Sequence, residues 1–388
     1  MTSKHLQLAL LLLLVFPLFS MGAKKDNSEK KETEEKGRKE ALEKRLAEEK
    51  EIKAQFEYSF NDVSDRIVTV SCENSKGRSS GSAFIATMDG ETYLFTNQHV
   101  ILGADKISFK TATGRTLRPL GVQLSSSLDI ARLPLDEAEG FAITKNMAMD
   151  APIAVFGNSE GGGVATELYG KITGVGADVI EVSADFVSGN SGSPVLNLDH
   201  EVIGIASYVS WKTSGKSDTV TRRFCYRLTN SKWISVNWKK YNDKYGKLHQ
   251  ENTELIDSIF EIANVWYTDP FNRVLAEDHP DAGLRNWSTE HNHMINRIGR
   301  QREKGHATTH ELANINKQIR KDMNDSAEDL SAVCKNRARQ MHFLATQKGL
   351  TEYLRNDFEN LAERLENAAY LIEVYGTELS KRDFFHFK

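Results

Sequence analysis

Apolar residues follow two different periods along this chain, and the change between them divides the sequence. From about residue 57 to 230, short runs rich in β-branched residues alternate with turn residues, the pattern of short β-strands. Many short strands at this spacing predict an all-β sandwich or barrel. The expected strands are Arg66–Ser71, Gly81–Ala86, Thr92–Thr96, Ile153–Phe156, Val179–Val182, Val195–Leu198, Val202–Tyr208 and Phe224–Leu228.

After about residue 231 the period becomes helical, and only six glycines occur in the last 158 residues. Two stretches repeat apolar positions at alternating steps of four and three, which predicts a helical hairpin turning near Gly349 or a coiled coil with another chain. The second alternative would make the protein a homo-oligomer through this tail. The stretches are Leu354, Phe358, Leu361, Leu365, Ala368, Ile372 and Tyr375, and Met323, Ala327, Leu330, Cys334, Arg337, Met341 and Leu344, with Arg337 out of pattern.

The N-terminal part has no core of its own. Residues 1–23 combine Lys4 with the apolar run Leu8–Phe19 and small residues after it, which is typical of a secretory signal peptide. Twelve apolar residues are short for a membrane span, and an uncleaved anchor is the alternative. Residues 24–56 form a charged spacer or solvated helix, since 24–53 hold 11 Lys or Arg and 10 Asp or Glu. The mature protein is therefore expected to be secreted or periplasmic, and a membrane partner is expected only for the uncleaved form.

Charge and cysteine content exclude some functions and leave others open. The net charge of −4 gives no reason to expect nucleic acid as a partner. Cys72 and Cys225 both fall in the β-rich part and are the pair to test for a disulfide, whereas three buried thiols are the alternative. The histidines His291, His293, His306 and His310 lack the further ligands of a metal site. No metal or other cofactor is expected.

The β-rich part carries the residues of a nucleophilic catalyst in one order. Ser191 lies in Gly-Asn-Ser-Gly-Ser-Pro, where glycines allow a tight exposed turn. A serine hydroxyl needs a base such as His99, and that base needs a carboxylate such as Asp129 to fix its tautomer. The turn also lets the N–H groups of Gly189 and Ser191 point at one spot, an oxyanion hole. Each signal is weak alone, but together and in this order they predict a catalytic triad.

These segments resemble the trypsin-like, chymotrypsin-fold serine proteases, and more specifically the bacterial HtrA/Deg-like branch. The resemblance covers roughly residues 57–235. It implies two six-stranded β-barrels with a cleft between them, and hydrolysis of protein or peptide substrates through an acyl-enzyme. The helical period after this part predicts an all-α domain over 236–388. The segments that carry it are Gly81–Ile85, Thr96–Val100, Asp129–Ala131, Phe156–Ser159, Gly170–Ile172, Gly189–Ser193 and Gly204–Tyr208.

The resemblance also implies where substrate binds. Ser207 and Tyr208 lie on the strand that would hold substrate backbone, and Asp185 lies six residues before Ser191, at the floor of the primary pocket. An aspartate there favours basic side chains. A solvated Asp185, or one neutralised by Arg222 or Arg223, is the alternative.

Three features depart from the family or stand outside its site. Ser193 replaces the usual glycine and is expected to crowd the loop slightly, and the tail does not resemble a PDZ domain. Trp233 and Trp238 are expected on a helix that closes the second barrel.

The rival hypothesis is a catalytically silent binding or scaffold protein, because a fold does not by itself grant activity.

Overall fold

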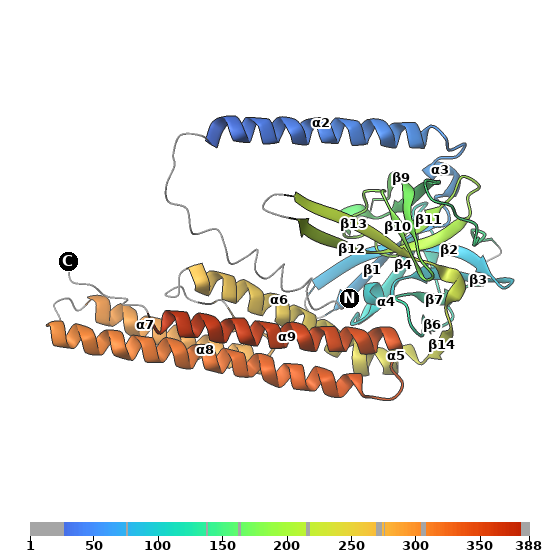
Figure 1. The fold of residues 1–388 in the computed structure, drawn as a ribbon. Coiled ribbons are helices and arrows are strands. Elements are labelled where there is room, and N and C mark those ends of the chain that lie inside the picture. The colour runs from blue at the N-terminus through green and yellow to red at the C-terminus, as the bar shows by residue number, and fades with distance from the viewer. Residues whose placement is uncertain are drawn as a thin grey trace. The chain divides into compact units, whose positions relative to one another are not determined.

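The computed structural model describes residues 27–74, 77–136, 139–161, 164–214, 218–268, 274, 276–303 and 308–381. The predicted signal peptide at 1–23 lies outside these residues. The chain forms two compact units, Met1–Gly246 and Lys247–Lys388, which are described separately (Figure 1). In the part of the chain that the structure describes, none of the helices has the length and apolar character that a membrane crossing requires.

The first half of the first unit is an antiparallel sheet of eight strands. Its order is β14-β6-β7-β3-β2-β1-β4-β5, so the last strand of the unit returns to pair with β6. The short helix α3 (Phe60–Val63) precedes β1 in the sequence, and the short helix α4 (Gln98–Ile101) lies between β3 and β4. The strands are β1 (Ile67–Asn74), β2 (Gly77–Met88), β3 (Glu91–Thr96), β4 (Lys106–Thr111), β5 (Thr116–Leu117), β6 (Val122–Ser125), β7 (Ala131–Pro134) and β14 (Trp233–Val236).

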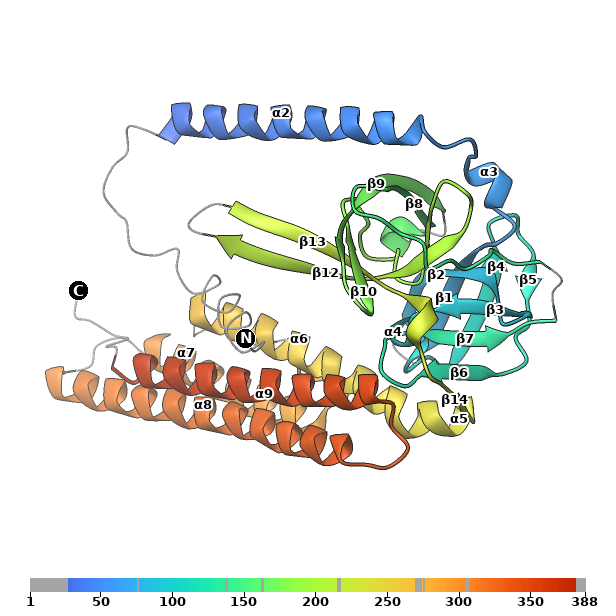
Figure 2. The same ribbon diagram turned by 45° about the vertical axis from the view of Figure 1, so that its right-hand side comes forward.

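The second half of the unit is a closed six-stranded barrel, seen as a ring in Figure 2. Its order is β10-β13-β12-β11-β8-β9, and the predicted β-rich fold is confirmed at this level. The strands are β8 (Pro152–Gly157), β9 (Thr166–Val175), β10 (Val179–Val182), β11 (Pro194–Leu196), β12 (Val202–Ser214) and β13 (Asp218–Tyr226).

Successive side chains of one strand belong to two different hydrophobic clusters. On β8, Ile153 and Val155 belong to a cluster inside the barrel, whereas Ala154 and Phe156 join a second cluster with Phe84 and residues of the eight-stranded sheet. Successive side chains of a strand point to opposite faces, so one strand can serve both clusters. The shared cluster fixes the sheet against the barrel, and the catalytic candidates come from both.

The segment that contains Trp233 and Trp238 does not have the secondary structure predicted from the sequence. Trp233 lies in a strand, not on a helix, and it pairs across β14 and β6 with Ser125. Its ring contacts Phe95, at 6.0 Å between centroids, and the guanidinium of Arg132 lies 4.4 Å from its centre. Trp238 begins the short helix α5 (Trp238–Tyr241). This segment therefore completes the first sheet and does not close the second barrel.

The charged N-terminal segment is helical over α2 (Asn27–Lys53), one of the two alternatives from the sequence. Leu42 and Leu46 are exposed, as expected for a solvated helix. The last turns nevertheless contact the barrel, because Ile52 is buried and Lys53 forms an ion pair with Glu167 of β9. The broken apolar stripe of this segment did not predict the docking, which combines one buried isoleucine with ion pairs.

The second unit consists of α6 (Lys247–Thr268), α7 (Ala282–Glu303), α8 (Thr309–Ala345) and α9 (Glu352–Leu379). Helices α8 and α9 pack as a hairpin around the turn that contains Gly349. Most positions of both apolar stretches are buried, and the out-of-pattern Arg337 bonds to Asp281 before α7, with 2.8 Å from Nε to Oδ2. The stretches are thus used within one chain.

Candidate active site

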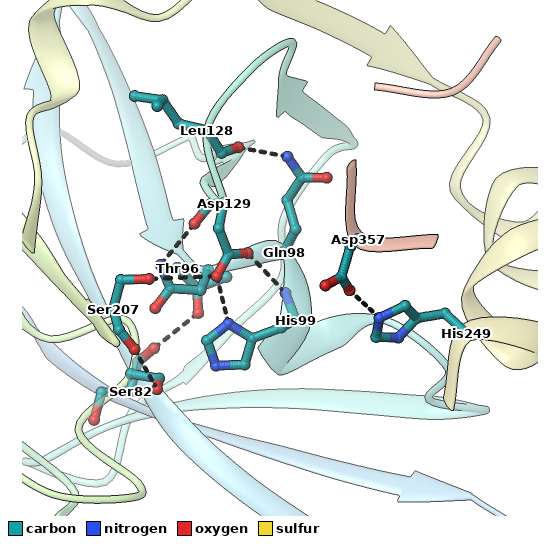
Figure 3. Close-up of polar contacts among 11 residues, drawn as sticks. Ser82, Thr96, Gln98, His99, Leu128, Asp129, Ser207, His249 and Asp357 are labelled. Carbon is teal, nitrogen blue, oxygen red and sulfur yellow. Dashed lines mark hydrogen bonds and ion pairs between the residues drawn. The ribbon is translucent and has the colours of Figure 1, made fainter. Parts of the chain in front are cut away.

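His99, in the short helix α4, and Asp129, in the loop between β6 and β7, form a close pair (Figure 3). The Nδ1 atom of His99 lies 2.5 Å from Oδ2 of Asp129, and the backbone N–H of His99 donates to Oδ1 at 3.0 Å. An ionised carboxylate only accepts hydrogen bonds, so this contact places the ring proton on Nδ1 and makes Nε2 the acceptor. That tautomer is the one a general base needs.

Asn97 and Gln98, which directly precede His99, hold the loop of Asp129 in place. The side-chain amide of Gln98 donates to the carbonyl oxygens of Ser125 and Leu128, at 3.0 and 2.8 Å, and that of Asn97 donates to the carbonyl of Asp129 at 2.6 Å. Gln98, Asn97 and Asp129 are all buried. Sequence reasoning missed these positioning residues, although their adjacency to His99 was a usable signal.

Ser191 lies on the loop between β10 and β11, and β2 supports that loop from the first sheet. The N–H of Ser82 donates to the Ser191 carbonyl at 2.9 Å, and the Ser82 hydroxyl donates to the Gly189 carbonyl at 2.8 Å. Gly192 has a φ of +91°, and a Cβ there would lie 1.9 Å from the Ser82 carbonyl oxygen. Glycine is therefore required after the serine for both conformation and space.

Ser207 connects the serine to the His99–Asp129 pair. It is the extra residue of a β-bulge in β12, because Ala206 pairs with Cys225 and the next pair is Tyr208 with Phe224. Its hydroxyl donates to Oδ2 of Asp129 at 3.4 Å, and its carbonyl accepts from Ser191 Oγ at 3.2 Å. Bulges often re-aim polar groups next to active sites. One residue thus contacts both ends of the predicted triad.

The candidate oxyanion hole has two backbone donors. Neighbouring carbonyls of the loop are occupied, since Asn190 O accepts from Ser193 N–H at 2.9 Å and Gly189 O accepts from Ser82. Within the described residues, the hydrogen bonds assign no protein acceptor to the N–H groups of Gly189 and Ser191. Both N–H groups therefore stay candidates for the oxyanion donors predicted from the sequence.

The three residues predicted to bind substrate differ in what they offer. Ser207 is buried and presents its carbonyl, whereas Tyr208 is exposed and stacks on Phe224 with 4.9 Å between ring centroids. The Asp185 carboxylate forms ion pairs with Arg223 and with Arg45 of α2. Arg222 pairs with Glu181 instead. Of the alternatives from the sequence, the structure shows the aspartate neutralised by Arg223.

The cysteines and histidines supply no further chemistry here. Cys72, Cys225 and Cys334 are free and buried, so the disulfide does not form. Burial raises the pKa of the Cys72 thiol to about 12 and raises those of Cys225 and Cys334 as well. His291 is buried, and His306 lies outside the described residues. Over the described ranges, no group of three or more His, Cys, Asp or Glu residues could hold a metal ion.

Ser193, the departure from the family pattern, is fully buried against Gly157 of β8. A Cβ on Gly157 would lie 1.8 Å from Ser193 Oγ and 2.7 Å from Ser82 Oγ. We expect Gly157→Ala to lower the free energy of unfolding by about 1–3 kcal/mol through overpacking, measured by chemical denaturation. Adding Ser193→Gly removes the nearest oxygen and should restore part of this loss.

Gly121→Ala is the matched control for this prediction, because a Cβ there meets nothing within 4 Å. It should change the free energy of unfolding by no more than about 0.5 kcal/mol. Equal denaturation midpoints for Gly157→Ala and Gly121→Ala would show that the contact between β8 and the serine loop is loose.

Part of this chain is similar to known proteins. Residues 80–205 match the family model of the trypsin-like peptidase domain. A probable periplasmic serine endoprotease, DegP-like, from Halomonas elongata is 32% identical over 149 residues, which cover 36% of this chain and 31% of that protein. The protein of the same description from Hahella chejuensis is 28% identical over 151 residues, covering 36% and 32%. The crystal structure of the serine endoprotease from Yersinia pestis is 24% identical, covers 44% of this chain and 62% of that one, and has a TM-score of 0.35.

Residues 80–205 are thus similar to the trypsin-like peptidase domain, the class of protein whose family model they match. Within that class the chain is similar to the HtrA branch, through its DegP-like relatives, and the resemblance expected from the sequence is confirmed. The chain spans about a third of the length of the curated relatives it matches.

Proposed function

We propose that the protein is a serine endopeptidase that cleaves peptide bonds through an acyl-enzyme. The observation that carries the proposal is the continuous set of contacts from His99 through Asp129 and Ser207 to Ser191. A catalytically silent scaffold is not favoured, because all three residue types of the triad are present and two already form the required hydrogen bond.

Each residue would have one role in the reaction. Ser191 Oγ would turn from the Ser207 carbonyl, give its proton to Nε2 of His99 and attack the substrate carbonyl carbon. The N–H groups of Gly189 and Ser191 would stabilise the oxyanion that forms. His99 would then protonate the leaving amine, and water would release the acyl group by the same steps in reverse. Asp129 would hold the imidazolium in orientation throughout.

The finer description of the fold is also part of the proposal. The eight-stranded sheet would be the first barrel of a chymotrypsin-like pair, with the closed barrel as the second and the catalytic residues divided between them. We propose a peptidase domain over residues 57–235 and a helical domain over 236–388. Residues 1–23 would be a signal peptide, and the protein would act in the periplasm or outside the cell, as the names of its DegP-like relatives suggest.

The substrates would be proteins or peptides, and the helical domain would mediate self-association or recruit them. The direct test is incubation of the purified chain with an unfolded protein, followed by mass spectrometry of the products. We expect new termini within the substrate sequence, unaffected by a metal chelator because no metal takes part in the proposed chemistry. An intact substrate after prolonged incubation with folded protein would contradict the proposal.

A further inference from the structure

The carboxylate of Asp185 is bound on both sides by arginines. Its Oδ2 atom lies 2.7 Å from Nη1 of Arg45 on α2, and its Oδ1 atom pairs with Nη2 of Arg223 on β13. The Arg223 side chain is only 15% exposed, whereas that of Arg45 is 55% exposed. Two guanidinium groups around one carboxylate leave this site with a net charge of +1.

Arg223 is held by the loop that leads to Ser191 and by the strand that contains Ser207. Its Nε donates to the carbonyl of Phe186 at 2.9 Å, on the loop that continues to Ser191. On the strand pair it lies opposite Val209, two residues beyond the bulged Ser207. The neighbouring Arg222 makes two bonds to Glu181, at 2.8 and 2.7 Å, because successive side chains of a strand point to opposite faces.

Arg45 is held by the docking of α2 on the barrel. Residues 45, 48, 49 and 52 share one face of the helix at steps of three and four. Glu48 pairs with Lys171 at 3.1 Å, Glu49 accepts from the backbone N–H of Tyr169 at 3.3 Å, and Ile52 is buried. The charged N-terminal helix therefore delivers a cation to the loop before the candidate nucleophile.

We propose that Arg223 and Arg45 are specificity-determining residues, and that they exclude substrates with lysine or arginine before the scissile bond. This inference rests on the proposed peptidase function. A free carboxylate at this position would bind a basic side chain through charge-assisted hydrogen bonds. Here both oxygens already accept from arginines, so a substrate cation would have to displace one of them beside the other. The helix α2 is thereby part of the specificity pocket.

The test compares Arg45→Ala, Arg223→Ala and the double variant with the unchanged protein. Two peptides that differ only in arginine or alanine before the scissile bond give a ratio of kcat/KM values. We expect this ratio to rise about tenfold to a hundredfold in the double variant, as for one gained hydrogen bond between charged groups, and less in each single variant. Adding Asp185→Ala to the double variant should abolish the gain. Arg222→Ala, whose side chain pairs elsewhere, should leave the ratio unchanged.

Benzamidine binding gives a second readout that does not need turnover. Calorimetry should show a Kd at least about tenfold lower for the double variant than for the unchanged chain. If the folded double variant keeps the kcat/KM ratio and the benzamidine affinity of the unchanged protein, the inference is overturned. A preference of the unchanged protein for the arginine peptide would also overturn it. If the double variant does not fold, Arg45→Ala alone is used for the same measurements, because it alters only an exposed side chain. Absence of peptide cleavage with the expected benzamidine gain would instead count against the proposed function.

Discussion

Replacing Ser191 with alanine is expected to lower kcat by about 10⁶-fold, to the level of the reaction without a nucleophile. In the proposed mechanism the Ser191 hydroxyl forms the acyl-enzyme, and the methyl group of alanine cannot act as a nucleophile. The fold should survive, since among the described residues Ser191 Oγ makes one hydrogen bond, to the Ser207 carbonyl. Initial rates of peptide cleavage, with circular dichroism on the same samples, measure both.

Ser188→Ala is the matched control, because this serine is exposed on the same loop. Its turnover should stay within a few-fold of the unchanged protein. Substantial activity in Ser191→Ala would move the nucleophile to another residue and remove the central assignment.

Replacing Asp129 with asparagine is expected to lower kcat by about 10⁴-fold while the fold persists. The asparagine can accept only with its carbonyl oxygen, so the two contacts now made to His99 cannot both be kept in their present form. His99 then loses the partner that fixes its proton on Nδ1, and the stabilisation of its imidazolium. Steady-state kinetics should show the loss mainly in kcat, with KM little changed.

Asp136→Asn, at an exposed position of the same half of the protein, controls for loss of a negative charge. A small effect of Asp129→Asn, equal to that of Asp136→Asn, would show that the contact between His99 and Asp129 is structural.

Strands with dense β-branched runs could be predicted from the sequence, but less regular ones could not. The run Thr92–Thr96 lies within the observed β3, and Val179–Val182 is β10. In contrast, β4 reads Lys-Ile-Ser-Phe-Lys-Thr, and β9 contains two glycines. Lysine and glycine are poor strand signals, and these segments form strands because β1 and β8 pair with them. Their existence depends on tertiary partners that a local pattern does not encode.

Candidates for a triad could be named from the sequence, but the roles of Ser82 and Ser207 beside them could not. Ser191, His99 and Asp129 stand in motifs of recognisable composition, whereas Ser82 and Ser207 are serines of ordinary strands. Their importance follows from the bulge in β12 and from the approach of β2 to the serine loop, which are features of the folded chain.

The ion pair between Arg45 and Asp185 could not be predicted from the sequence either. Arg45 lies 140 positions before Asp185 in the sequence, inside a segment whose composition suggests a solvated helix. Nothing in the period of that segment distinguishes Arg45 from its neighbours. Only the docking of α2 through Ile52 and its ion pairs brings this arginine to the loop.

The most direct test of the central claim is the mass of the folded protein after reaction with a fluorophosphonate, followed by peptide mapping. The probe phosphonylates a serine only when a base and an oxyanion hole activate it. The account predicts a single adduct on Ser191 that is lost in His99→Ala and after unfolding. No adduct on the folded protein, or an adduct on a different serine, would contradict it.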